Sequence, residues 1–307
     1  MKKNLLLLGF IFCGMSVIGQ TQKKESWYFK LGGSYFTQTA ATEFPIVSES
    51  LPNTDVYAAN GTTLVSREAN TGSFGEGFRG GVTAGYRFST RLGVEMGFNY
   101  FKSNSKTMVE TVNRLVAPGP VFVSGTAVGQ ITAFDVAPAI VLFLGETKGF
   151  EPYTKVGIIV PVVGDLTIET NRTYTTPAGI TTAYAKDVIL PNPTVGFMAV
   201  LGTSYKLGKN ISAFAELEYR NFTVHGKSKE TEVYTENGVD RLNTPTGFRQ
   251  DASYSASHVN YVEQINTTSN NKLTNGAGFD SSRAADDISS YVGISGLGLT
   301  LGLKYSL

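Results

Sequence analysis

The sequence predicts an all-β fold, a transmembrane antiparallel up-and-down β-barrel with long extracellular loops. Three observations favour it. The 307 residues include 34 Gly, 19 Phe and 15 Tyr, and only 17% are charged, which is more typical of strands than of helices. Short segments alternate between apolar and polar residues, the pattern of a strand with two different faces. The connections between these segments alternate between long and short, as they do in membrane barrels.

The first twenty residues are predicted to be a cleaved export signal. Lys2 and Lys3 precede an apolar run over residues 5–18, and Gly19 is a small residue next to the cleavage site. The run is short for a membrane-anchoring helix, which is the alternative interpretation. Cleavage removes the single cysteine, Cys13, and two of the 26 basic residues, so the formal charge becomes −1. Disulfides and cysteine chemistry are then excluded, and the charge does not favour nucleic-acid binding.

Eight segments show the alternation expected of strands, and residues 92–101 show it most clearly. There Leu, Val, Met, Phe and Tyr share one face, and Gly, Glu and Asn share the other. The eight segments are residues 27–38, 78–88, 92–101, 130–144, 152–160, 194–206, 211–219 and 296–305. The short connections are residues 89–91, 145–151 and 207–210. The long ones are residues 39–77, 102–129, 161–193 and 223–290.

Short inner turns, long outer loops and an even number of strands are features of outer-membrane barrels, in which both chain ends lie on the inner side. We therefore expect eight strands. If residues 108–116, 121–128 and 166–190 also cross the membrane, the number rises to between ten and fourteen, and a pore becomes possible.

The chain ends in Leu299-Thr-Leu-Gly-Leu-Lys-Tyr-Ser-Leu307. Together with the export signal and the paired strands, this ending resembles the small outer-membrane β-barrel proteins of Gram-negative bacteria, the group of the outer-membrane protein A, X and W types. The resemblance implies location in the outer membrane and, as partners, membrane lipid, lipopolysaccharide and the outer-membrane assembly machinery. It also implies an assembly signal, formed by Leu299, Leu301, Leu303, Tyr305 and Leu307. Leu307 stands where that family usually has an aromatic residue, and Tyr305 is the nearest substitute.

The polar strand faces carry isolated charges and many glycines, which suits the inside of a narrow barrel. The predicted lumen charges are Lys30, Arg79, Arg87, Glu95, Asp135, Lys155, Glu216, Glu218, Arg220 and Lys304. Charges in a barrel interior must pair or be hydrated, so we expect a network of ion pairs that plugs the lumen. Glu95 is expected to pair with Arg79 or Arg87. The expected partners of Glu216 and Glu218 are Arg220 and Lys304.

No residue pattern predicts catalysis, a metal site or a cofactor, and we expect the protein not to be an enzyme. His225 and His258 are the only histidines, and neither belongs to a recognisable catalytic motif. We expect both to be solvated loop residues. The loop acids Asp280, Asp286 and Asp287 lack the spacing of a calcium-binding loop.

The long connections are rich in Thr, Asn, Ser and Gly, which is typical of an exposed surface. We expect a monomer with a structural or surface-binding role through these loops. Within them, residues 166–174 and 180–190 are predicted to form a hairpin that projects above the membrane. One alternative is a narrow porin or transporter for small, including hydrophobic, solutes, with residues 156–163 and 195–201 as its apolar wall. Others are a lipid-modifying enzyme and a soluble β-protein.

Overall fold

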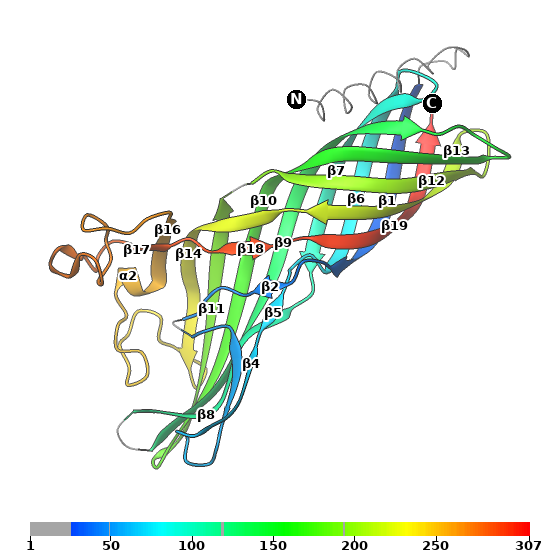
Figure 1. Ribbon diagram of the computed structural model, residues 1–307. Helices are drawn as coiled ribbons and strands as arrows, with labels where there is room; N and C mark the ends of the chain where they lie inside the picture. The colour runs from blue at the N-terminus through cyan, green and yellow to red at the C-terminus, as the bar shows by residue number, and fades with distance from the viewer. Residues whose placement is uncertain (1–25, 49, 118–119, 193) are drawn as a thin grey trace, which may run out of the picture.

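Figure 1 shows the protein as a computed structural model that describes residues 26–307, apart from 49, 118–119 and 193. The predicted export signal lies outside the described residues. Strands make up most of the chain, and nearly all belong to one sheet. No helix in the described part of the chain is long and apolar enough to span a membrane.

A closed ring of antiparallel strands forms the barrel. Its strands are β1 (Ser26–Gln38), β6 (Gly77–Arg87), β7 (Leu92–Ser103), β9 (Val121–Phe143), β10 (Phe150–Thr176), β12 (Gly196–Lys206), β13 (Ile211–Asn221) and β19 (Gly296–Ser306). Pairing runs around the ring in this order. The ring closes because β19 also pairs with β1, from Tyr28↔Ser306 to Gln38↔Gly296. The all-β barrel class predicted from the sequence is confirmed, and each alternating segment overlaps one ring strand.

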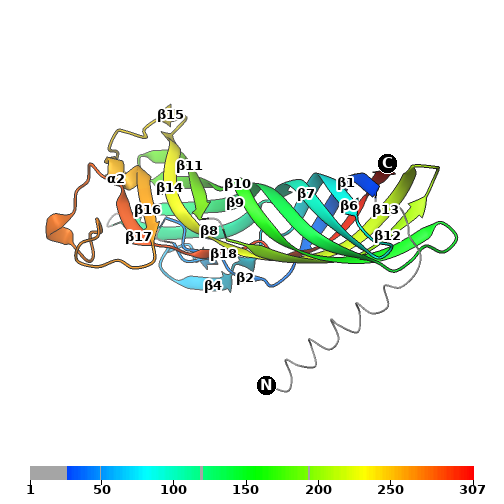
Figure 2. The ribbon, with the colours of Figure 1, turned by 90° about the horizontal axis from the view of Figure 1, so that it is seen from above.

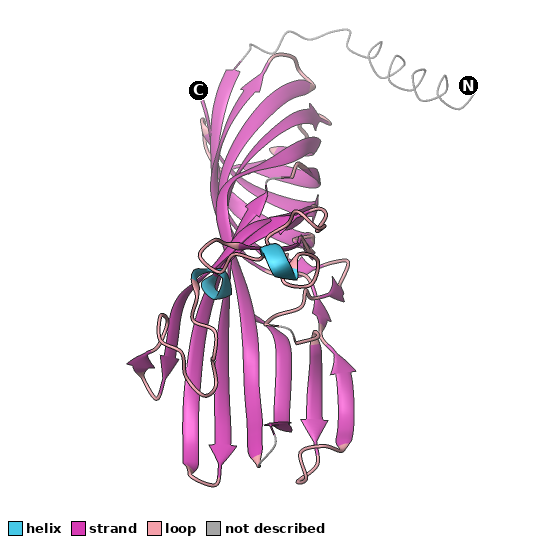
Figure 3. Cartoon of the chain, turned by 90° about the vertical axis from the view of Figure 1, so that its left-hand side faces the viewer, coloured by secondary structure: helices cyan, strands magenta, loops and turns pink. Residues whose placement is uncertain are grey.

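Two ring strands continue far beyond the barrel. β9 has 23 residues and β10 has 27, whereas the other ring strands have 11 to 13. At about 3.3 Å per residue, β10 spans roughly 90 Å. The outer parts of β9 and β10 pair with β8 (Lys106–Ala117) and β11 (Gly179–Asn192), and β14 (Thr223–Glu236) pairs with β11. We call this projecting part the outer sheet (Figures 1 and 3).

The hairpin predicted above the membrane is present in the outer sheet. β10 and β11 pair from Leu166↔Ile189 to Thr176↔Gly179. Much of the segments expected as outer connections, residues 102–129 and 161–193, is therefore strand. Their Thr-rich sequence looks like an exposed loop, yet β-branched threonine also favours strands, and one face of this sheet is solvated.

Short elements complete the outer end. β3 (Asn53–Tyr57) and β4 (Leu64–Ala69) form a hairpin, and β3 lies parallel to β8. The remaining elements are β2 (Thr42–Glu43), β5 (Thr71–Gly72), β15 (Val239–Asp240), β16 (His258–Val262), β17 (Ala285–Ile288), β18 (Tyr291–Gly293), α2 (Tyr254–Ser257) and η1 (Gly276–Gly278). Figure 2 shows α2, β15, β16 and β17 at one end of the molecule, β2, β4 and β18 nearer its middle, and the C-terminus toward the other end.

The outward face of the barrel is apolar and exposed. On β19, Leu297, Leu299, Leu301 and Leu303 are 40–57% exposed, and the other ring strands present Phe, Val, Ile, Leu and Tyr in the same way. An apolar surface of this extent is rare on soluble monomers, which keep exposed apolar patches small.

The inward face buries charged and aromatic side chains. Residues 136–144, which are apolar on both faces in the sequence, follow the same division. Ile140 is 58% exposed, whereas Val141 and Phe143 are fully buried and pack with Tyr28 and Tyr153. The inward apolar residues of β9 therefore fill space between the aromatic side chains of facing strands.

Candidate functional site: the barrel lumen

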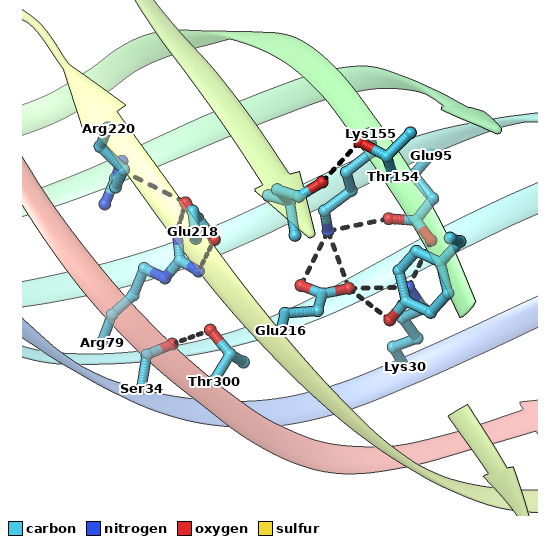
Figure 4. A network of polar contacts seen from close by, with 12 residues as sticks. Lys30, Ser34, Arg79, Glu95, Thr154, Lys155, Glu216, Glu218, Arg220 and Thr300 are labelled. Carbon is cyan, nitrogen blue, oxygen red and sulfur yellow. Dashed lines mark hydrogen bonds and ion pairs between the residues drawn. The ribbon is translucent and has the colours of Figure 1, made fainter. Parts of the chain in front are cut away.

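Two lysines and two glutamates form a closed cluster in the middle of the lumen (Figure 4). Lys30 Nζ lies 2.6 Å from Glu95 Oε1 and 3.0 Å from Glu216 Oε1. Lys155 Nζ lies 3.1 Å from Glu95 Oε2 and 2.9 Å from Glu216 Oε2. Each lysine thus contacts both carboxylates, and the four side chains come from β1, β7, β10 and β13. All four are buried, so these ion pairs are screened little by solvent.

Two tyrosines complete the coordination of the carboxylates. Tyr28 Oη donates to Glu95 Oε1 at 3.0 Å, and Tyr153 Oη donates to Glu216 Oε1 at 2.8 Å. Lys30 Nζ also lies 4.4 Å from the centroid of the Tyr153 ring. Both phenols are buried, so the cluster is enclosed by polar partners and aromatic rings.

A second layer of charges lies on the side of the outer sheet. Arg79 forms a bidentate pair with Glu218, with Nη1–Oε1 at 2.6 Å and Nη2–Oε2 at 2.5 Å. Arg220 Nη2 contacts Asp135 Oδ2 at 2.6 Å, and Asn99 Nδ2 donates to Asp135 Oδ1 at 2.8 Å. Arg220 Nε lies 3.7 Å from Glu218 Oε1, which joins the two pairs.

A third layer closes the inner end, where the turns are short. Arg87 Nη1 lies 2.6 Å from Glu151 Oε1, and Lys304 Nζ lies 3.6 Å from Glu151 Oε2. The Arg87 guanidinium also stacks 4.0 Å from the centroid of the Phe143 ring. Glu151 is absent from the predicted lumen charges because the sequence predicts a turn over residues 145–151. Its even spacing from Tyr153 and Lys155 is the signal that could have found it.

All ten predicted lumen charges are buried, but several partners differ from those expected. Glu95 pairs with Lys30 and Lys155, not with Arg79 or Arg87. Glu216 pairs with the same two lysines.

The positions of the two arginines along β6 account for these differences. Glu95 lies opposite Gly85 of β6. Arg79 is six positions from Gly85 and too far along the strand, whereas Arg87 is only two positions from it but pairs with Glu151 instead. Of the expected pairs, Glu218 with Arg220 is present at 3.7 Å.

Little free space remains around the charges. A cavity of about 40 Å³ lies among Lys30, Glu95 and Glu216, where Gly32, Gly81 and Gly97 contribute no side chains. That volume holds a few water molecules at most.

An apolar layer covers the charges toward the outer end. Phe74, Met108 and Ile159 are fully buried in one cluster with Phe44 and Phe222. Phe74 reaches this place because the segment before β6 folds inward, and Ser73 Oγ donates to the carbonyl of Ser295 at 3.1 Å.

A separate apolar pocket of about 270 Å³ lies in the wall where β10 changes its partner. β10 pairs with β12 as far as Ile159↔Gly196 and with β11 from Leu166↔Ile189. Between these points its register with β9 shifts at Pro161–Val163. The lining includes Ile131, Pro161, Val163, Leu190, Phe222 and Ile294. The predicted apolar wall contributes residues 161–163 to this lining, whereas residues 195–201 contribute none.

The expectation that His225 and His258 are solvated loop residues was wrong, because His225 lies half-buried in β14 and His258 half-buried at the start of β16. His225 Nδ1 lies 3.2 Å from Ser289 Oγ, and the His258 ring stacks on Tyr254 at 3.7 Å. Among the loop acids, Asp286 accepts from the amide of Asn270. Asp280 accepts a hydrogen bond from the Ser282 amide in its loop, and Asp287 accepts one from the Ile288 amide within β17.

The residues of the predicted assembly signal lie on β19 and at the chain end. Leu299, Leu301, Leu303 and Tyr305 are exposed on the outward face. The amide of Leu307 donates to the carbonyl of Trp27 at 3.0 Å, which ties the chain end to the first strand.

No protein-family profile matches the sequence, and no curated protein matches it. Among solved structures, the chain is similar to the crystal structure of the outer membrane protein OprG from Pseudomonas aeruginosa, with a TM-score of 0.38 and 11% sequence identity. The similarity covers 93% of this chain and 97% of that one.

Proposed function

We propose that the protein is an integral β-barrel of the Gram-negative outer membrane, a monomer with a plugged lumen and a surface-binding outer sheet. The observation that carries this proposal is the closed ring of strands, apolar and exposed outside, ion-paired and buried inside. The short ring strands have 11 to 13 residues, close to the roughly 9–11 that a tilted strand needs to cross a bilayer. Membrane lipid, lipopolysaccharide and the assembly machinery are its proposed partners.

The packing inside the ring supports a closed lumen. Charged side chains from facing strands meet in three layers, and the apolar cluster around Phe74 covers them on the outer side. Opening the lumen would separate these ion pairs and leave buried charges without partners, at a cost of several kcal/mol for each pair. We therefore assign the barrel a structural role and place no catalytic step, metal or cofactor in it.

The outer sheet supports a binding role. β4 is exposed along its whole length and pairs with β3 on one side, and exposed sheet edges can accept a strand from a partner. The connection between β16 and β17, residues 263–284, is a second exposed candidate. Replacing it with a Gly/Ser linker leaves the pairing of β14 with β11 intact. Reduced binding of cells to surfaces or ligands would support the proposal, and unchanged binding and fitness would count against it.

Membrane insertion is tested by fractionation. We expect the protein to sediment with outer membranes, to require detergent for extraction and to migrate differently on a denaturing gel before and after heating. Recovery in the soluble fraction without detergent would contradict the proposal.

The apolar wall pocket favours a second candidate, transport of small hydrophobic solutes. Its lining is mainly Ile, Val, Leu, Pro and Phe, and it opens where the wall pairing changes. Filling it by Ala133→Trp should weaken binding of an apolar fluorescent probe to the folded protein, compared with Ala215→Trp on another strand. Equal probe binding by both variants would exclude this pocket as a binding site for hydrophobic solutes.

A further inference from the structure

Two inner turns lie side by side at the end of the barrel away from the outer sheet. One joins β9 to β10 and the other joins β12 to β13. The Lys206 amide donates to the Gly149 carbonyl at 2.9 Å, and Phe150 pairs with Tyr205 on the adjoining strands. Between the turns lies an open groove of about 390 Å³.

The groove is basic. Lys148, Lys206 and Lys209 line it, all three are exposed, and Glu146 is the one acidic residue among its lining side chains. The Ser306 amide donates to the Asn210 carbonyl at 2.8 Å, so the end of β19 lies beside the second turn. The lining therefore carries an excess of positive charge, which attracts anions.

The basic groove borders the apolar outer surface directly. The Phe150 and Tyr205 rings lie 4.6 Å apart, and their side chains are 52% and 44% exposed on the outward face. Leu207, which lines the groove, and Leu144, next to the first turn in the chain, are also exposed. Exposed aromatic residues of this kind mark the boundary between hydrocarbon and headgroups in membrane barrels. The lysines thus stand at headgroup level and the apolar side chains at the level of the acyl chains.

We propose that this groove binds an anionic glycerophospholipid of the inner leaflet. The three lysines hold its phosphate headgroup, and its acyl chains lie along Phe150, Tyr205 and Leu207. Anionic headgroups are preferred because a zwitterionic lipid offers no net charge to the lysine excess. This inference rests on the proposed membrane insertion, and it adds a specific lipid site on the inner side.

Native mass spectrometry of the detergent-solubilised full chain, with equal phosphatidylglycerol and phosphatidylethanolamine, tests the site. We expect the wild type to retain phosphatidylglycerol preferentially. The triple variant Lys148→Gln, Lys206→Gln, Lys209→Gln should lose about tenfold or more of that preference, given the contribution of each basic residue near a membrane surface. The single variants Lys148→Gln and Lys209→Gln, at exposed turn positions, should give smaller losses. The matched control Lys227→Gln, Lys229→Gln, Lys272→Gln removes three lysines at the outer end and should keep the preference.

An unchanged preference in the triple variant, or an equal loss in the control, would overturn the site. Heat-modifiable migration on a denaturing gel is recorded for every variant, to show that each variant forms a folded barrel. A folded, membrane-inserted wild type with no lipid preference would contradict this inference alone. A wild type that does not insert would contradict the proposed function as well.

Discussion

Arg79 and Glu218 face each other across the lumen as a bidentate ion pair, 2.6 and 2.5 Å between paired atoms. They belong to β6 and β13, which are separated by β1 and β19 around the ring. The pair therefore links two parts of the wall that are not adjacent. Such two-bond contacts between guanidinium and carboxylate are stronger and more directional than single ones.

Replacing Arg79 alone should destabilise the barrel more than replacing Arg79 and Glu218 together. Arg79→Met leaves Glu218 buried with only the longer contact to Arg220 and should cost about 3–5 kcal/mol of unfolding free energy. The double variant Arg79→Met, Glu218→Met should recover most of that loss. Urea unfolding in micelles measures both. Arg67→Met breaks the exposed pair with Asp55 and should cost less than about 1 kcal/mol. A single variant at Arg79 as stable as the double one would contradict the account.

Space in the lumen next to Tyr28 is filled completely. A Cβ at Gly85 would lie 2.2 Å from Tyr28 Cζ, and the Tyr28 ring is held by Glu95 and Phe143. Gly85→Ala should therefore cost about 1–3 kcal/mol through overpacking. Gly80 lies on the same strand with open space around its Cβ position, so Gly80→Ala should change stability by less than about 0.5 kcal/mol. Equal effects in thermal unfolding would argue against a tightly packed lumen.

The outer rim contains a carboxylate whose contacts make stability depend on pH. Lys106 donates to Glu76 at 2.5 Å, and Tyr35 donates at 3.1 Å, so the pKa of the Glu76 carboxyl is lowered from its ordinary value. A lowered folded-state pKa adds stability above the unfolded pKa of about 4.3, and this is lost as pH falls through the folded value.

Glu76→Gln should therefore reduce stability at neutral pH, and the difference from wild type should disappear in acid. Unfolding measured across this pH range gives the result. A difference that stays constant with pH would contradict a charge-based contribution from Glu76.

The sequence alone predicts which lumen charges are buried, because alternation assigns each strand position to one face. Arg79, Glu95 and Glu216 all follow this rule. It does not predict their partners, because contacts across the lumen depend on the stagger between strands that are distant in the chain. Glu95 meets Lys30 and Lys155 for this reason.

The outer sheet was harder to predict than the barrel. Residues 167–176 of β10 and their partners on β11 are rich in Thr, so the contrast between their faces is weak. Their strand conformation depends on β9 and β14 alongside, which supply the backbone partners. The wall pocket depends in the same way on the register shift at Pro161–Val163, which has no local sequence signature.

Single-channel recording in planar lipid bilayers tests the closed lumen most directly. Insertion is verified first by heat-modifiable migration of the reconstituted protein. With the ion pairs of Lys30, Lys155 and Arg79 in place, we expect no steady open current. A steady open conductance of nanosiemens size would contradict the plugged barrel.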